Sequence, residues 1–193
     1  MVKFIHAADV HLGIMVAGVG KSQKEIAREL KQAAFDAFER VIDTAIEEEV
    51  DALVLAGDLL DSSRTFVKEK LFLQSQLNRL APFGIPVIVA LGNHDAGSAY
   101  VSGEHIYTLG SAVETIEVET RNGERVAFSG FSYEVPVVAT RKVQEYPAKS
   151  ANCDIHIGVL HGELTTAQGR YAPFSIPELR EKGYDYWALG HIH

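Results

Sequence analysis

Short apolar runs alternate with amphipathic stretches along the first half of the chain. The runs Val2 to Ala8, Ala52 to Ala56 and Val87 to Ala90 are typical of strands that are covered on both faces. Between the first two runs, apolar residues from Ile26 to Ile46 recur every three or four positions, which predicts a long amphipathic helix. A second helix is predicted over Phe66 to Leu80. Two strand–helix units in a row indicate an α/β sheet.

The second half of the chain is richer in strands. Ile116 to Glu119 alternates apolar and acidic residues, Asn122-Gly123 is a hairpin-turn pair, and Val126 to Ser129 returns, which predicts antiparallel pairing. Further predicted elements are strands over Ile155 to Leu160 and Tyr186 to Leu189 and a short helix over Glu178 to Lys182. Val135 to Tyr146 fits either a short helix or an irregular connection. This order predicts two packed sheets with helices outside, in one domain over residues 1–193.

Residues of the types that bind metals follow these apolar runs. They are Asp9 and His11, Asp58, Asn93 and His94, His161, and His191 and His193. Open α/β sheets bind ligands at the carboxyl ends of their strands, and residues two apart at a strand end point to one face. Five of the eight histidines lie in these segments. We therefore expect the segments to meet in one cleft and to bind two divalent metal ions.

Each segment taken alone has a simpler interpretation. The Asp9-x-His11 pair fits polar residues at a strand end, and Gly57-Asp58 is a common turn. Asn93 and Asp95 fit helix N-caps. The joint pattern favours the two-metal site, because every one of these segments comes directly after an apolar run.

The donor types indicate which metals and which reaction are expected. Carboxylate, imidazole and amide together suit Mn²⁺, Fe or Zn²⁺ better than Ca²⁺. Asp58 is the natural bridge between two cations about 3.5–4 Å apart. A water between such cations loses its proton near neutral pH and can attack phosphorus. His94, beside the predicted ligand Asn93, is the candidate acid for the leaving oxygen.

Composition and charge narrow the class of protein. Apolar residues make up 47% and charged residues 23%, as in an ordinary soluble domain. The net charge of −8 argues against bulk electrostatic binding of nucleic acid, although two bound cations would invert the local field. The single cysteine, Cys153, is expected to be a small core residue, and it forms no internal disulfide. Without a signal-peptide pattern or a run of ~20 apolar residues, we expect a cytoplasmic protein with no membrane partner.

The motifs resemble a known superfamily in their order along the whole chain. The matching segments are Asp9-x-His11, Gly57-Asp58, Gly92-Asn93-His94-Asp95, His161-Gly162 and Gly190-His191-Ile192-His193. They resemble the signature of the calcineurin-like metallophosphoesterases. Phe4 to Gly13, Gly57 to Asp61 and Tyr184 to His193 are similar to the DNA double-strand-break repair exonucleases of the SbcD and YhaO type. Ser62-Ser63 and Asp95 differ from the protein-phosphatase branch, which has Arg-Gly and Glu there.

The resemblance implies a fold, a ligand set and two catalytic residues. The fold would be a four-layer α/β/β/α sandwich of two mixed sheets, of the metallo-dependent phosphatase type, holding two Mn²⁺ ions. One metal would take Asp9, His11, Asp58 and His193, and the other would take Asp58, Asn93, His161 and His191. His94 would act on the leaving group, and Asp61 would orient His94.

The resemblance also implies partners and leaves alternatives. Relatives continue past the last histidine into a DNA-capping domain and a segment that binds an ABC- or SMC-like ATPase, so we expect a nuclease core without those regions. The expected function is Mn²⁺-dependent exonuclease or endonuclease cleavage of DNA in repair. One alternative is a phosphodiesterase or phosphatase for small phosphoesters or nucleotides. A non-catalytic scaffold is the other alternative, and the complete ligand set with His94 speaks against it.

Overall fold

The computed structural model describes residues 1–13, 24–61, 67–97 and 101–192. Its elements in chain order are β1 (Phe4–Ala7), α1 (Lys24–Glu47), β2 (Ala52–Ala56), α2 (Val67–Asn78), η3 (Ala81–Phe83), β3 (Val87–Ala90), β4 (Ile106–Thr108), β5 (Glu114–Glu119), β6 (Arg125–Gly130), η4 (Lys142–Glu145), β7 (Ile155–His161), α3 (Ile176–Glu181) and β8 (Tyr186–Gly190). His193, a predicted metal ligand, lies outside the described residues. Among the helices that are described, none is long and apolar enough to span a bilayer.

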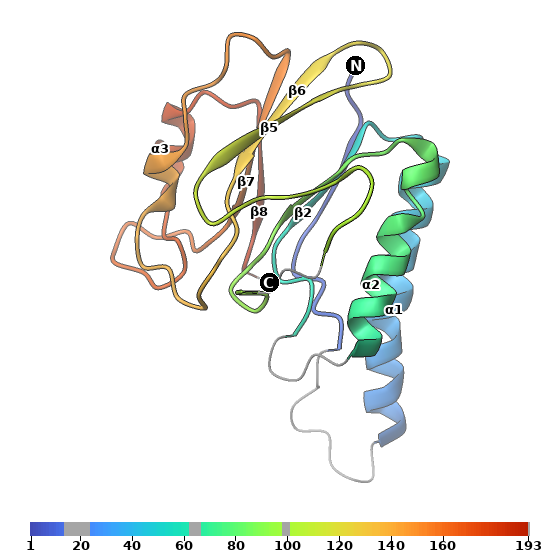
Figure 1. Cartoon of the computed structure of the whole chain (residues 1–193). Coiled ribbons are helices and arrows are strands. Elements are labelled where there is room, and N and C mark those ends of the chain that lie inside the picture. Colours follow the sequence, from blue (N-terminus) through green and yellow to red (C-terminus); the bar gives the residue numbers. More distant parts are fainter. Residues whose placement is uncertain (14–23, 62–66, 98–100, 193) are drawn as a thin grey trace.

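Two four-stranded sheets form the centre of the molecule. The first has the order β1-β2-β3-β4 and the second the order β5-β6-β7-β8. Figure 1 shows α1 and α2 on the outer side of the first sheet and α3 on the outer side of the second. The predicted four-layer α/β/β/α arrangement is confirmed.

The first sheet differs from the predicted mixed arrangement. Its described strands are all parallel, whereas the second sheet combines an antiparallel β5–β6 pair with parallel β6, β7 and β8. Parallel neighbours require a crossover that returns the chain to the starting edge. The connections through α1 and α2 are two such crossovers, and the connection from β3 to β4 makes the third without a described helix.

Strand β2 shows why the apolar runs are continuous. All five of its residues are buried, because both faces of the strand are covered. Leu53 and Leu55 pack in a cluster with Phe38 of α1, and Val54 packs in another with Phe128 of the second sheet. A strand between two apolar layers needs apolar residues at every position.

The predicted apolar stripe of α1 is buried only in its second half. Phe38 and Ile42 are at most 1% exposed, whereas Ile26 and Leu30 are 50% and 47% exposed. The blue N-terminal part of α1 extends below the sheets in Figure 1. The helical period is therefore correct, but burial follows the extent of the sheet beneath the helix.

The second half of the chain matches the predictions in part. The hairpin is confirmed, since β5 and β6 pair antiparallel around Asn122-Gly123. The segment from Val135 to Tyr146 is irregular apart from the short η4. Strand β4 was not predicted, because three residues give too little periodic signal. Cys153 is half-buried in the turn before β7 rather than a core residue.

Helix α3 begins at Ile176, two residues before the predicted start. A capping box explains the difference: Glu178 accepts hydrogen bonds from the Ser175 backbone N–H at 2.8 Å and from its hydroxyl at 2.7 Å. The box begins outside the predicted helix, because Pro177 separates Ser175 from Glu178 in the sequence. Proline is tolerated there, since the first helical turn has no intrahelical partner for that N–H.

Candidate metal centre

The carboxyl ends of strands from both sheets meet at one edge of the molecule. Figure 1 shows β2 and β8 ending on the same lower side of the sheets. The predicted ligands follow the strands at this edge: Asp9 after β1, Asp58 after β2, Asn93 after β3, His161 ending β7 and His191 after β8. The fold thereby brings together residues that are far apart in the sequence.

Two groups of donor atoms share one aspartate. Asp9, His11 and Asp58 form one group, and Asp58, His161 and His191 form the other; within each group the donor atoms lie within 4.8 Å of one another. Asn93 adds an amide oxygen, whose Oδ1 lies 3.1 Å from both His161 Nε2 and His191 Nδ1. Every predicted ligand that the structure describes is therefore at the centre. The assignment of each to a bound metal stays a prediction.

Asp58 lies in the middle of the centre and is 2% exposed. Its Oδ1 accepts the His94 backbone N–H at 2.8 Å. Its Oδ2 lies 3.2 Å from His161 Nε2 and 3.7 Å from His11 Nε2. Burial alone would raise the pKa of Asp58, but the hydrogen bonds and positive charge of its neighbours, His161 first, lower it overall. Asp58 is thus held as a carboxylate between the two groups.

His161 provides the clearest test of whether the residues fit a metal. Its ring is buried, and Nδ1 lies 3.0 Å from the Ala56 carbonyl oxygen, so a proton on Nδ1 is donated there. Nε2 of that tautomer has a lone pair facing two further acceptors, the oxygens of Asn93 and Asp58. A cation between these acceptors, either a proton or a metal ion, satisfies such an arrangement. Burial lowers the pKa of His161, but Asp58 outweighs burial and raises it. The donor set therefore fits a divalent metal.

The backbone at the centre is held in an unusual conformation. Asp9, His11, Asp58 and His191 all have positive φ, at 54°, 45°, 52° and 111°. Left-handed backbone costs non-glycine residues of order 1–3 kcal/mol and concentrates at functional sites. Hydrogen bonds hold it: Asp9 N donates to Gly57 O at 3.0 Å, and His191 N donates to Asp9 Oδ2 at 2.9 Å.

Glycines allow the elements to approach closely around the donors. A Cβ on Gly57 would lie 2.3 Å from His161 Nδ1, and one on Gly92 would lie 2.2 Å from Asp58 Oδ1. Both separations are far below van der Waals contact. The glycines beside the ligands are therefore required by packing against the donors themselves.

Asp95 organises the centre in a way that the sequence did not reveal. It is 1% exposed, and its carboxylate accepts backbone N–H groups of Leu59, Leu60 and Gly92, each at 3.0 Å. These bonds tie the loop that carries Asp58 to the loop that carries Asn93. No helix begins at Asp95, so the N-cap interpretation fails. Its position directly after the Asn93-His94 pair was the available signal.

His94 and Asp61 lie at the open side of the centre. His94 Nδ1 is 3.7 Å from Asp61 Oδ1, and the side chain of His94 is 41% exposed against 15% for Asp61. The His94 ring meets the His11 ring edge-on, with centroids 5.0 Å apart. The structure thus places the predicted catalytic pair together, at the edge of the donor groups and in contact with solvent.

Two residues of the segment after β7 also reach the centre and were not predicted. The Tyr171 ring lies 4.7 Å from the His191 ring, tilted by 45°. Glu163 holds Tyr171 in place by accepting its backbone N–H at 3.2 Å. Burial and the neighbouring His161 lower the pKa of His191, which favours the neutral, metal-binding form. A tyrosine in an irregular segment carries no sequence signal for such a contact.

Comparisons with known proteins agree with this geometry. The family model described as calcineurin-like phosphoesterase matches residues 2–193. The chain is 38% identical over 197 residues to the uncharacterized metallophosphoesterase YhaO of Bacillus subtilis, covering 98% of this chain and 48% of that protein. It is 26% identical over 207 residues to the DNA double-strand break repair protein Mre11 of Methanopyrus kandleri, covering 99% of this chain and 44% of that protein.

Another archaeal relative has a similar identity and coverage. The Mre11 protein of Sulfurisphaera tokodaii is 29% identical over 205 residues, covering 99% of this chain and 49% of that protein. The chain spans about half the length of the curated relatives that it matches. Its own ligand motifs, the shared Asp58 and the match over residues 2–193 lead to one conclusion: the chain belongs to the calcineurin-like phosphoesterase family.

Proposed function

We propose that the chain is the catalytic core of a Mn²⁺-dependent DNA nuclease that acts in DNA repair. The observation that carries the proposal is the pair of donor groups sharing Asp58, with His94 beside them. Hydrolysis of a phosphoester is the reaction class of the family. Restriction to DNA is supported by the names of the Mre11 relatives, whereas YhaO is named only as a metallophosphoesterase.

In the proposed reaction, some residues of the chain would bind the metal ions and others would transfer a proton. When bound, two divalent ions supply Lewis acidity, which activates water and neutralises charge on a phosphate. The mixed oxygen and imidazole donors suit Mn²⁺, and they also admit Fe or Zn²⁺. Asp58 joins the two donor groups, and Asn93 together with the imidazoles of His161 and His191 completes the second.

In this proposal His94 gives a proton to the leaving oxygen. Asp61 faces Nδ1 of the His94 ring, so Asp61 would orient the ring and Nε2 would be the nitrogen that donates the proton. The exposure of His94 lets the ring take up a new proton from water after each turnover. Asp61 acts through His94 and is therefore a positioning residue.

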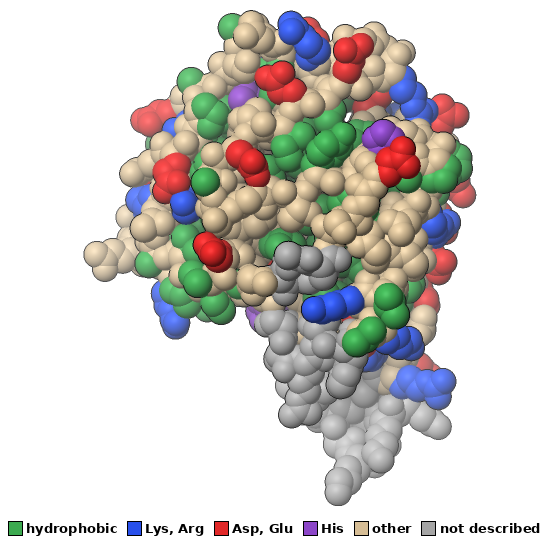
Figure 2. Space-filling model, viewed as in Figure 1, with side chains coloured by type: hydrophobic (Ala, Val, Ile, Leu, Met, Phe, Trp, Pro, Cys, Tyr) green, Lys and Arg blue, Asp and Glu red, His purple; other side chains and the backbone are tan. Residues whose placement is uncertain are grey.

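The distribution of charge on the surface bears on how the protein would bind DNA. The net charge is −8, and Figure 2 shows acidic and basic side chains interspersed on the face in view rather than gathered into a basic patch. Binding would then depend on the centre more than on a wide electrostatic surface. This observation favours a second candidate, a phosphodiesterase for small phosphoesters or nucleotides.

We further propose that the whole protein is cytoplasmic and works with an ABC- or SMC-like ATPase.

A direct comparison of substrates tests the proposal. End-labelled single-stranded and duplex oligonucleotides and bis(p-nitrophenyl) phosphate would be incubated with the protein and Mn²⁺. We expect the oligonucleotides to be cut, and the His94→Gln variant to lose this activity while retaining metal. Hydrolysis of the small diester with intact oligonucleotides would replace the nuclease proposal with the second candidate. No hydrolysis of either, with metal bound, would favour the scaffold.

A further inference from the structure

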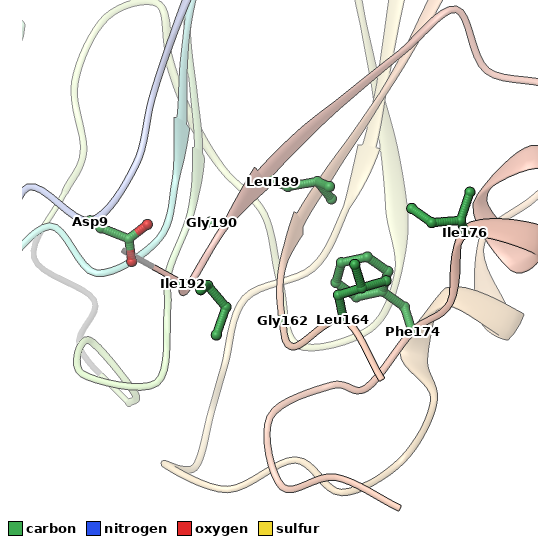
Figure 3. Close-up of a pocket in the computed structure, with 8 residues that line it drawn as sticks. All are labelled: Asp9, Gly162, Leu164, Phe174, Ile176, Leu189, Gly190 and Ile192. Atoms are coloured by element: carbon green, nitrogen blue, oxygen red, sulfur yellow. The ribbon is translucent and has the colours of Figure 1, made fainter. Parts of the chain in front are cut away.

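An apolar pocket opens directly beside the metal centre. Figure 3 shows it between the end of β8, the segment after β7 and the start of α3. Its volume is about 180 Å³, and its side chains come from Asp9, Leu164, Phe174, Ile176, Leu189 and Ile192. Asp9 is its single ionisable side chain, and Asp9 belongs to the first donor group. The pocket is therefore continuous with the place where a phosphate would be held.

The rim of the pocket exposes large apolar side chains to solvent. Leu164, Ile176 and Ile192 are 58%, 42% and 72% exposed, whereas Phe174 beneath them is 2% exposed. Several exposed apolar side chains gathered at a concave site next to catalytic residues indicate a ligand surface. The floor is made by backbone, since Gly162 and Gly190 also line the pocket.

The pocket is preformed because polar contacts fix the segment that builds it. Leu164 and Phe174 face each other in a parallel β-bridge. Arg141 donates from Nη2 to the Thr165 carbonyl at 3.2 Å and pairs with Glu178 of α3. A pocket held in this way requires little ordering when a ligand enters it.

The lining favours an apolar surface of limited size, such as the face of one ring system. Apart from Asp9, no side chain that lines the pocket offers a hydrogen-bond donor or acceptor. The volume is below the ~300–1,000 Å³ of pockets for drug-sized ligands. A single ring system fits this description, and in a phosphodiester of DNA the ring system is the base. Because the lining does not read base edges, recognition would be independent of sequence.

We propose that this pocket binds the base of the nucleotide whose phosphate lies at the metal centre. The proposal rests on the proposed nuclease function and deepens it. A base can enter only when it is unpaired and unstacked, because a paired base is covered on both faces and along its edge. The enzyme should therefore prefer single strands and frayed ends over intact duplex, and should cut poorly at an abasic position.

Equilibrium binding tests the pocket without turnover. Deoxythymidine 5′-monophosphate and methyl phosphate carry the same phosphate group and differ in the base and sugar. Titration calorimetry with Mn²⁺ present should give a Kd roughly 10-fold lower for the nucleotide, in line with the usual value of stacking one base. Leu164→Asn and Ile176→Asn should reduce this difference severalfold. Leu71→Asn is the matched control, because Leu71 is similarly exposed, at 65%, on α2.

Cleavage experiments separate failure of the pocket from failure of the nuclease proposal. Oligonucleotides with and without a base at the scissile position should be cut with a kcat/KM ratio of about 10, and the two pocket variants should lower this ratio. If no oligonucleotide is cut but the nucleotide still binds better than methyl phosphate, the pocket stands and the DNA substrate falls. If oligonucleotides are cut while both monophosphates bind equally, the pocket falls. If Leu164→Asn weakened the binding of both monophosphates equally, the pocket proposal would also be overturned, because Leu164 would then act on the metal centre.

Discussion

The two sheets contribute chemically different parts of the metal centre and support them differently. The first sheet supplies the carboxylates of Asp9 and Asp58, the amide of Asn93 and the imidazole of His11, whereas the second supplies the imidazoles of His161 and His191. The first sheet is covered by α1 and α2, and the second by the short α3 and an irregular segment. Apolar clusters pack the outer faces of both sheets, and polar clamps such as the Arg141–Glu178 pair add to this packing on the second.

This difference shows how the two sides can respond separately to change. Backbone hydrogen bonds and Asp95 fix the loops of the first sheet. On the second sheet, His161 is held through Ala56 and Tyr133 as well as Asn93 and Asp58, and the Arg141–Glu178 pair adds to the packing of the outer layer. Substitutions at these points should therefore have separate effects on the two sides.

The largest effect is expected where the two sides meet. Asp58→Asn removes the shared carboxylate, so both ions should bind more weakly and turnover should fall by roughly 10³-fold or more, since each ion stabilises developing charge by several kcal/mol. Metal analysis beside a phosphodiesterase assay measures both effects. His191→Ala is the comparison variant and should weaken the second group more than the first. Two tightly bound ions in Asp58→Asn would show that the centre is not shared.

A smaller loss is expected from the proton donor on the first side. His94→Gln should lower turnover by about 10²–10⁴-fold with both metals retained, because it removes general acid catalysis without removing a predicted ligand. Asp61→Asn should cost about 10-fold in turnover with both metals retained, because Asp61 acts through His94. Loss of metal together with activity in His94→Gln would mean that His94 is a ligand.

Stability of the first side should depend strongly on Asp95. Asp95→Asn replaces a buried carboxylate that accepts three N–H groups, so the free energy of unfolding should fall by about 2–4 kcal/mol. Asp154→Asn is the control, since exposed Asp154 accepts one N–H, from Arg125, and should cost under about 1 kcal/mol. Urea unfolding at neutral pH measures both. Similar losses in the two variants would remove Asp95 from the role of organising residue.

The smallest effect concerns the clamp of the second side and depends on pH. The Arg141 guanidinium holds the pKa of Glu178 at about 2, against an ordinary value of 4.5. A lowered pKa in the folded state gives stabilisation that is complete above pH 4.5 and is lost as the pH falls toward 2. With the carboxylate 19% exposed, we expect about 1–2 kcal/mol. Glu178→Gln should therefore be less stable than the unsubstituted protein at pH 6, and the gap should close between pH 4.5 and 2. A gap that is constant with pH would contradict the ionic clamp.

Most of the structure on the first-sheet side of the metal centre could be predicted from the sequence, because its buried strands leave a visible apolar pattern. A strand such as β2, covered on both faces, needs a continuous apolar run, and such runs are visible without a structure. The ligands directly follow these runs, so the ligands were also visible. The role of Asp95 was not visible in the sequence, because its three partners come from two loops that only the folded chain brings together.

Less of the second side was predictable. The irregular stretch before β7 and the segment carrying Tyr171 have no period, and tertiary contacts such as the Arg141 bonds decide their shape. The apolar pocket combines residues from three separate segments, so no local pattern reveals it. The assignment of His193 remains a prediction from the sequence.

The hydrogen bond between the His191 backbone N–H and Asp9 can form only late in the synthesis of the chain. The two residues are 182 positions apart, and ribosomes add about 5–20 residues per second. Roughly 10–40 s therefore pass between the appearance of Asp9 and that of the group that holds it. During this interval the growing chain lacks both His191 and the N–H group that holds the Asp9 carboxylate, so the full set of donors exists only after β8 has been synthesised.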